Sequence, residues 1–498
     1  MTRMRTLLSI DCPDNDVIRV GNVWYMVSTT MHFMPGCEIM KSHDLCHWEH
    51  AAYVCDRLDS TPGQCMEGER NIYGKGMWAA SLRYHKGCFY ICFVANDTGK
   101  TYLFRSGSIE GLWKKNSIDG FYHDCSLLFD DDGSTYIAYG NRDIYITELN
   151  DELTGPKENG FSRLAVSDSA ETPLGYEGTH FYKINGTYYL FFIHSLKERW
   201  FRAESCFMSD SLDGVFTGGD IFCNDNGYFG SGIAQGAITD TPDGRWYAIL
   251  FQDRGASGRI PYLLPMHFEG KMPVIEAADD ILTEKIDGNY GLGTGSDDFR
   301  TVYEHDSCFG FKNIWQFNHE PDLSLIERNT DNGFYRVTTG KICTSPVQAV
   351  NTLTQRMSEP GCRATVTVDG TGLGHGDYAG ILVLQYIYAF IGITPSKEGY
   401  DIVMMSRNAE NGCEEITTIT SVSSGKIRFS VKADFSGDES EAEFSYDCGD
   451  GFKTVPEKKK MYFRLEHFTG NRFGLTVFST EKPGGKAGFS SFVYEIDR

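Results

Sequence analysis

Short runs of aromatic and aliphatic residues, each opened by a glycine, recur five times in the first three hundred residues. They are GNVWYMVS from Gly21, GCFYICF from Gly87, GSTYIAYG from Gly133, GTYYLFF from Gly186 and GRWYAILF from Gly244. Each run carries a tyrosine soon after its glycine, and the runs begin 46 to 66 residues apart. This interval suits a four-stranded blade with loops of variable length, so the repeat predicts a five-bladed β-propeller.

Beyond about residue 300 the repeat stops, although strand-like runs continue. ATVTVDG, AGILVLQYIYAFIGI and FGLTVFS alternate or run apolar over strand length, between Gly, Asp and Asn turns. No helical period is sustained along the chain. We therefore expect an all-β protein with a propeller over residues 1–300 and a two-sheet β-sandwich over residues 306–498. The segment from Lys285 to Asp306 is the expected connection.

One position of the repeat is acidic in three of the five blades. Counting back twelve positions from the tyrosine reaches Trp78, Asp124, Glu177 and Gln235 in repeats two to five, and counting back eleven reaches Asp14 in the first. Equivalent places in equivalent blades are related by rotation about the propeller axis, so these side chains are expected on one ring. A single acidic residue before a strand is often an ordinary turn former. Three acidic residues at equivalent positions are harder to explain as turn formers, because crowded like charges lower stability and are expected only where function requires them.

Composition narrows the choice of ligand and compartment. The formal net charge is −22, which disfavours nucleic acid and anionic membrane surfaces as partners and suits a neutral ligand such as a sugar. There are 15 cysteines, and several lie in apolar runs, as Cys88 and Cys92 do. We expect buried thiols of a reducing compartment there, rather than a metal or redox site. No signal peptide or membrane span is apparent, so a cytoplasmic location is expected.

Longer motifs add a resemblance. They are DNDVIRVGNVWYMVSTT from Asp14, GMWAASLRYHKGCFYI from Gly76, HDCSLLFDDDGSTYIAYGN from His123, EGTHFYKINGTYYLFF from Glu177 and GIAQGAITDTPDGRWYAILFQDRGASGRIPYLLP from Gly232. Together they resemble glycoside hydrolase family 43, which groups β-xylosidases and α-L-arabinofuranosidases on a five-bladed propeller. WQFNHEP from Trp315, NTLTQR from Asn351 and GDYAG from Gly376 resemble the concanavalin-like β-sandwich of the β-xylosidase branch. The resemblance spans nearly the whole chain.

The resemblance implies roles for the ring. Asp14 matches the family's general base, Asp124 its pKa modulator and Glu177 its general acid. Asn15 follows the base here, where the family often has proline. Gln235 stands where many members have a histidine near the axis, and we expect it to contact substrate. Because that histidine is missing, metal ligands stay unassigned.

Other residues are candidates for contact with the sugar. Trp78 and Phe33 are expected to stack on its apolar face, although core packing explains Phe33 equally well. Arg259 resembles a substrate-contacting arginine of the family, with a surface position at a strand end as the alternative. For His32, a structural role in a loop is the simpler expectation. The loop from Asp56 to Lys75 is expected to form part of the pocket wall.

These features predict an inverting exo-glycoside hydrolase that releases terminal β-xylosyl or α-L-arabinofuranosyl units from xylan- or arabinan-derived plant oligosaccharides. Inversion needs an acid and a base about 6.5–9.5 Å apart, which residues from different blades can provide. Two alternatives stay open: a non-catalytic carbohydrate-binding protein, and a family 43 hydrolase for another sugar such as galactose. The chemistry requires no cofactor. The sandwich is expected to bind sugar or to lend a loop to the site, and a structural calcium without identified ligands is a further expectation.

Overall fold

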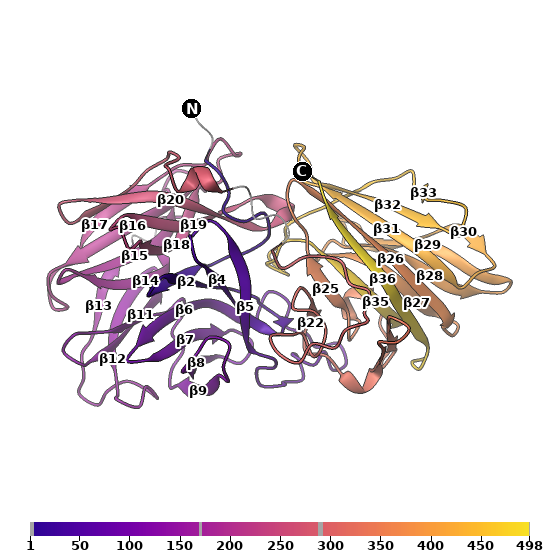
Figure 1. The fold of residues 1–498 in the computed structure, drawn as a ribbon, viewed down its shortest axis with the longest axis horizontal. Coiled ribbons are helices and arrows are strands. Elements are labelled where there is room, and N and C mark those ends of the chain that lie inside the picture. Colours follow the sequence, from indigo (N-terminus) through magenta and orange to yellow (C-terminus); the bar gives the residue numbers. More distant parts are fainter. Residues whose placement is uncertain (1–3, 169–171, 287–291, 498) are drawn as a thin grey trace.

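Two all-β parts lie side by side, a ring of small sheets at the N-terminal end of the chain and a pair of larger sheets at the C-terminal end (Figure 1). The structure, a computed structural model, describes residues 4–168, 172–286 and 292–497. Helices within these ranges are limited to four 3-10 turns: η1 (Gly255–Ser257), η2 (Thr283–Lys285), η3 (Leu323–Leu325) and η4 (Pro346–Gln348). None of the helices described is long and apolar enough to cross a membrane.

The N-terminal part is a five-bladed β-propeller, which confirms the prediction from the repeat; each blade is a four-stranded antiparallel sheet. Blade I contains β1 (Asp16–Val20), β2 (Val23–Ser28), β4 (Gly36–Ser42) and β5 (Trp48–Cys55). Blade II contains β6 (Met77–His85), β7 (Cys88–Ala95), β8 (Lys100–Ser106) and β9 (Lys114–Ile118). Blade III contains β10 (Ser126–Phe129), β11 (Thr135–Asn141), β12 (Asp143–Leu149) and β13 (Ser162–Ser167). Blade IV contains β14 (Glu177–Ile184), β15 (Thr187–Ser195), β16 (Arg202–Ser209) and β17 (Thr217–Phe222). Blade V contains β18 (Ile233–Asp240), β19 (Trp246–Asp253), β20 (Arg259–Glu269) and β21 (Met272–Ile275).

The glycine of each repeat lies in the turn between the first and second strands of its blade. All five glycines have φ between 64° and 93°, a left-handed conformation that glycine adopts at little cost. The repeat tyrosines follow on the second strands β2, β7, β11, β15 and β19. The sequence repeat is therefore the tight hairpin that begins every blade.

Apolar side chains are buried mainly between neighbouring blades. Five hydrophobic clusters occupy the junctions between consecutive blades, including the junction that closes blade V against blade I. The innermost strands β1, β6, β10, β14 and β18 contact one another in a closed ring. Each sheet buries its faces only against its neighbours, so the five blades stabilise one another around a common axis.

A buried ion pair lies on the propeller axis, between the innermost strands of three blades. Arg83 on β6 donates from Nη1 to Asp16 Oδ2 on β1 at 2.7 Å and from Nη2 to Ser126 Oγ on β10 at 2.6 Å. Both charged groups are buried. Side chains of three blades thus meet on the axis, and each charge is compensated where it is removed from water.

The C-terminal part is a β-sandwich, as predicted. One sheet has the strand order β3-β22-β25-β35-β27-β28-β29-β30 and the other β23-β24-β36-β26-β31-β32-β33, with β34 also pairing with β32. The strands of the first are β3 (Phe33–Met34), β22 (Gln316–Asn318), β25 (Leu353–Arg356), β35 (Arg472–Ser479), β27 (Asp377–Leu384), β28 (Ala389–Ser396), β29 (Gly399–Arg407) and β30 (Glu414–Val422). Those of the second are β23 (Ile326–Asn329), β24 (Phe334–Thr338), β36 (Lys486–Ile496), β26 (Gly361–Gly372), β31 (Lys426–Asp434), β32 (Glu441–Asp447), β33 (Lys453–Thr454) and β34 (Lys459–Lys460). One large cluster of buried apolar side chains forms the core of the sandwich.

The two parts share a sheet. Strand β3 leaves blade I and pairs with β22 of the sandwich. Close by, Arg356 Nη1 of the sandwich donates to Glu38 Oε2 of blade I at 2.6 Å, and both side chains are almost fully buried. A continuous sheet and a buried ion pair therefore hold the sandwich against the propeller.

Most of the 15 cysteines are buried. Cys92 lies in the core between blades II and III, with its Sγ 3.4 Å from Cys125 Sγ, whereas Cys88 is half-buried. The buried thiols agree with the prediction from the apolar runs. The reducing, cytoplasmic compartment inferred from them stays a prediction.

Candidate active site

The five ring positions lie at one end of the innermost strands. Asp14 and Asp124 come just before β1 and β10, whereas Trp78, Glu177 and Gln235 lie near the beginnings of β6, β14 and β18. Asp14, Asp124 and Gln235 have φ of 54°, 47° and 64°, which is uncommon for residues other than glycine. The pairing register also shifts in β6, β14 and β18 near this end. The structure thus brings one residue of each blade to a common ring through locally strained backbone.

Asp14 is held by an arginine of blade V. Arg259 Nη1 lies 3.1 Å and 3.2 Å from the two carboxyl oxygens of Asp14, and both side chains are buried. Burial raises the pKa of Asp14; Arg259 opposes this rise, and Asp124 adds to it. A carboxylate that is more basic than usual yet paired with a cation is suited to accept a proton from water. Arg259 is therefore a buried partner of Asp14, not an exposed residue at a strand end.

Asp124 and Glu177 are held by donors of neighbouring backbone and side chains. Gly178 N donates to Asp124 Oδ2 at 2.9 Å, and Asn141 Nδ2 donates to Glu177 Oε2 at 2.6 Å. Burial raises the pKa of Asp124, with His123 lowering it and Glu177 raising it further. Gly178 has a φ of 66°, and a Cβ there would lie 2.6 Å from the Gln235 side chain. Glycine at this position therefore lets the Gln235 side chain of blade V lie close against blade IV.

A hydrogen bond from its backbone N–H anchors Gln235. Its N–H donates at 2.7 Å to Oε2 of Glu204, a wholly buried carboxyl whose pKa is raised by burial. Its side chain packs against Gly178 beside the acidic residues. The position is compatible with the expected contact to substrate, which stays a prediction.

His123 is the main functional candidate that sequence reasoning missed. Its Nε2 lies 3.5 Å from Asp124 Oδ2 and 3.8 Å from Glu177 Oε2. These carboxylates raise the pKa of His123 to about 9, Asp124 having the larger effect, although burial works against the rise. The residue directly precedes Asp124 in HDCSLLFDDDG, and that adjacency was the available signal. Only the fold shows that Glu177 lies on its other side.

A loop of the sandwich reaches the ring. Phe468 lies under the Arg259 guanidinium, whose central carbon is 4.5 Å from the ring centroid, and its carbonyl accepts from Arg259 Nη2 at 3.3 Å. The rings of Phe468 and the half-buried Trp78 are 6.3 Å apart. Asp11 fixes this loop, because its Oδ2 accepts from Gly470 N at 2.8 Å. Of the two roles expected for the sandwich, the geometry fits a loop lent to the rim, with Trp78 and Phe468 as neighbouring walls.

Phe33 is not available to a sugar, which corrects the expectation that it stacks on one. It is almost fully buried in β3, and the Arg472 guanidinium lies 3.6 Å from its ring centroid. The chain enters the sandwich sheet at this point, so the phenylalanine packs in the junction. His32 beside it is also buried, with its ring 4.8 Å from those of Tyr73 and His319. A structural role for His32 agrees with the simpler expectation.

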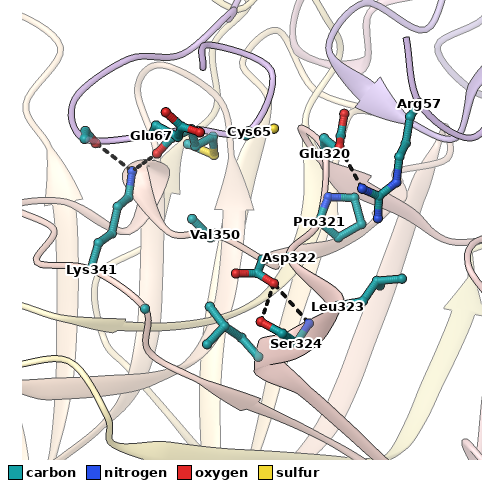
Figure 2. A pocket seen from close by; sticks show the side chains of 14 residues that line it. Arg57, Cys65, Glu67, Glu320, Pro321, Asp322, Leu323, Ser324, Lys341 and Val350 are labelled. Atoms are coloured by element: carbon teal, nitrogen blue, oxygen red, sulfur yellow. Dashed lines mark hydrogen bonds and ion pairs between the residues drawn. The ribbon is translucent and has the colours of Figure 1, made fainter. Parts of the chain in front are cut away.

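The loop from Asp56 to Lys75 packs against the sandwich. Lys341 Nζ donates to the carbonyls of Met66 and Gly68, and Arg57 pairs with Glu320 at 2.8 Å. These residues line a cavity of about 640 Å³ between the two parts (Figure 2).

The end of this loop touches the one that carries Phe468. A Cβ on Gly74 would lie within 3.0 Å of the Leu465 and Glu466 carbonyls, so the two backbones are in close contact. The loop therefore contacts the loop that carries Phe468, and its expected part in the pocket wall stays a prediction.

One group of ligand atoms in the described part of the chain is close enough together to hold a metal ion. His123, Asp124 and Glu177 each offer an atom within 4.8 Å of the others. A cation there would occupy the carboxyl expected to carry a proton, so the arrangement fits proton transfer better than metal binding. A structural calcium in the sandwich stays a prediction.

Comparison with known families divides the chain as the fold does. Residues 5–272 match Glycosyl hydrolases family 43, and residues 310–495 match the Beta xylosidase C-terminal Concanavalin A-like domain. A putative beta-xylosidase of Xylanibacter ruminicola is 27% identical over 403 residues, covering 76% of this chain and 71% of that protein. A beta-xylosidase of Formosa agariphila is 24% identical over 566 aligned positions, covering 100% of this chain and 90% of its own length.

Among solved structures, a bifunctional GH43-CE protein of Bacteroides eggerthii is similar over the full chain, with a TM-score of 0.91 and 34% sequence identity. The chain spans 64% of that protein. The match therefore covers both the propeller and the sandwich in one arrangement.

Proposed function

The chain belongs to glycosyl hydrolase family 43 and is a glycoside hydrolase, and we propose that it removes terminal pentose units from oligosaccharides with inversion at the anomeric carbon. The proposed substrates carry β-xylosyl or α-L-arabinofuranosyl ends, as fragments of xylan and arabinan do. The names of the two curated relatives favour β-xylosyl as the first to test. The single observation that carries the proposal is the ring, on which Asp14, paired with Arg259, faces an axis shared with Asp124 and Glu177.

Asp14 acts as the general base in this proposal. Its carboxylate accepts a proton from the water that attacks the anomeric carbon, and Arg259 keeps it charged until then. Glu177 acts as the general acid on the opposite face of the sugar and protonates the leaving oxygen as the glycosidic bond breaks. Asp124 is the pKa modulator in this proposal and lies next to the acid, because its Oδ2 accepts from the backbone N–H of Gly178, the residue after Glu177.

The surroundings of the ring support an exo-acting enzyme. Trp78 and Phe468 provide aromatic surface beside the acidic residues, which suits the apolar face of a single sugar ring. Phe468 comes from the other domain, so the site is bounded on that side by the sandwich loop. A bounded pocket accepts the end of a chain in preference to its middle.

The first test replaces the proposed acid and base. We expect Asp14→Asn and Glu177→Gln to fold and to lower kcat on nitrophenyl β-xyloside or α-L-arabinofuranoside by about 10²–10⁴-fold, as loss of a general acid or base does. Glu177→Gln should keep the thermal unfolding temperature, whereas Asp14→Asn should lower it, because Arg259 then stays buried without its partner's charge. Asp131→Asn, in an exposed turn of blade III, is the matched control and should keep activity. Near-normal turnover by either ring variant would reject the assignment.

Two further measurements test the identity of the sugar and the stereochemistry: activity on a panel of glycosides, and the anomeric configuration of the product. Galactosides belong in the panel, and turnover of galactosides without pentosides would replace the substrate while keeping the enzyme class. Proton NMR of the first product formed from an oligosaccharide reports its anomeric configuration. Retention in place of inversion would exclude the proposed roles, because it requires a nucleophile rather than a base.

A further inference from the structure

His123 is a titratable group that the proposed mechanism does not yet use. Its Nε2 lies 3.5 Å from Asp124 and 3.8 Å from Glu177, distances longer than a direct hydrogen bond. This nitrogen is buried, and it has no hydrogen-bond partner in the part of the chain that the structure describes. The imidazole therefore lies between the two carboxylates as a partner for their charge.

The groups around this imidazole favour its charged form. Asp124 and Glu177 face Nε2 and raise the pKa of the ring, and Cys125, two residues further along the chain, raises it as well. Trp78 of blade II, 5.7 Å away between ring centroids, and Asn141 of blade III bring no charge. Arg259 pairs with Asp14, and burial lowers the pKa of His180.

A cation beside a general acid poses a chemical problem. Near neutral pH, His123 binds a proton and favours the ionised form of Asp124, yet the proposed mechanism needs a proton on Glu177 when the glycosidic bond breaks. The cluster of His123, Asp124 and Glu177 holds the needed proton, but on the ring nitrogen of His123 instead of on the carboxyl of Glu177. Groups that interact this closely titrate together, and the proton belongs to the cluster rather than to one residue.

We propose that His123 is a positioning residue that stores the catalytic proton and passes it to Glu177 when substrate fills the site. The inference rests on the proposed function, because it assigns the source of the acid's proton. Binding of a sugar removes water from the cluster, which disfavours the charged pair and favours neutral imidazole with neutral carboxyl.

The proton balance of this sequence is complete. The Nε2–H bond of His123 breaks and an O–H bond forms on Glu177, which leaves neutral imidazole. That O–H bond then breaks as the leaving oxygen takes the proton and the electron pair of the glycosidic bond, while Asp14 takes a proton from the attacking water. Afterwards, Asp14 releases its proton to solvent and His123 takes one up, so the enzyme is restored.

The pH profile of kcat/KM tests the proposal directly. In His123→Gln, we expect the alkaline limb to move to lower pH by about one unit or more, because the cluster no longer keeps its proton into the alkaline range. The acid limb, which Asp14 sets, should stay in place. His43→Gln, an exposed residue far from the ring in sequence, is the control and should reproduce the wild-type profile. An alkaline limb that does not move in His123→Gln would overturn the proposal.

Leaving groups separate proton storage from a structural role. A dinitrophenyl pentoside departs without protonation, whereas an oligosaccharide needs the acid. We expect His123→Gln and His123→Asn to lose at least about tenfold more activity on the oligosaccharide than on the dinitrophenyl substrate. Equal losses on both substrates would indicate a purely structural residue and refute the inference.

A titration that needs no turnover keeps this inference separate from the proposed function. We expect an NMR titration of the His123 ring protons, assigned by comparison with His123→Gln, to have its midpoint well above the ordinary histidine pKa in the intact protein. Glu177→Gln should lower that midpoint, since one of the two facing charges is removed. Absence of pentoside turnover by the wild type would reject the proposed function alone. A midpoint at or below the ordinary histidine value would reject the role of His123.

Discussion

At the scale of single residues, one buried cation decides the state of the proposed base. Asp14 and Arg259 are both buried, and burial alone would favour the neutral carboxyl. Arg259 offsets that effect, and the ring of Phe468 covers its guanidinium. The pair therefore resembles other buried ion pairs, in which each charge depends on its partner.

The decrease of kcat/KM at low pH, its acid limb, tests the pair of Asp14 and Arg259. In Arg259→Met we expect the pKa of Asp14 to rise further, because the opposing cation is lost and burial remains. The base is then ionised only at higher pH, so the acid limb of kcat/KM moves upward by about one unit or more, and activity falls more at pH 5 than at pH 8. Arg254→Met, in the same loop but paired with Glu359, should leave the limb unchanged. An unmoved acid limb in Arg259→Met would contradict this role.

At the scale of elements, strands and loops have separate tasks. The innermost strands place one residue of each blade on the ring, and inter-blade packing makes these positions rigid. The loops supply walls, and the loop from Phe463 to Asn471 does so from the sandwich. Its support includes stacking of Tyr73 on His467, at 3.7 Å between ring centroids. A wall from another domain can differ in shape without disturbing the propeller.

Truncation of that wall should affect substrate binding. We expect Phe468→Ala to raise KM for an aryl pentoside by about tenfold, which corresponds to roughly 1.4 kcal/mol of lost apolar contact, while unfolding of the protein changes little. Leu465→Ala is a matched control, because this side chain on the same loop is exposed. A Phe468→Ala enzyme with unchanged KM and kcat would show that the ring is not part of the pocket.

At the scale of the whole molecule, the propeller and the sandwich depend on buried ionisable groups at their junction. Burial works to raise the pKa of Glu38, but Arg356 and His50 lower it to about 2. Nearby, burial lowers the pKa of His319 to about 3, and His32 and His467 are shifted in the same direction. Acid therefore weakens the junction through the histidines as pH falls below about 6.5, and through Glu38 below about 4.5.

Replacement of one junction charge should be costly. We expect Glu38→Gln to lower the free energy of unfolding at pH 7 by about 3–5 kcal/mol, because Arg356 stays buried without a compensating charge. The variant should also lose less additional stability between pH 4.5 and pH 3 than the wild type does, since the depressed Glu38 pKa is the source of that loss. Urea unfolding at both pH values measures this. Glu49→Gln, at an exposed pair with Lys41, is the control. Equal stability of Glu38→Gln and the wild type would refute the role of the pair.

Much of the architecture and part of the site followed from the sequence. A left-handed turn glycine and a strand tyrosine repeat in every blade because each blade begins with the same hairpin, so blade number and fold were predictable. Rotation about one axis then placed Asp14, Asp124 and Glu177 at equivalent positions without knowledge of any contact. The periodic pattern carries this information because it is local and repeated.

Tertiary structure alone decided which side chains meet across blades and domains. His123 adjoins Asp124 in the chain, but its nearness to Glu177 depends on how blades III and IV pack. Phe468 reaches the ring only because the sandwich docks on the propeller, and Phe33 is buried because its short strand completes a sheet of the other domain. Such contacts depend on packing between segments far apart in the chain, which no local pattern of hydrophobic and polar residues encodes.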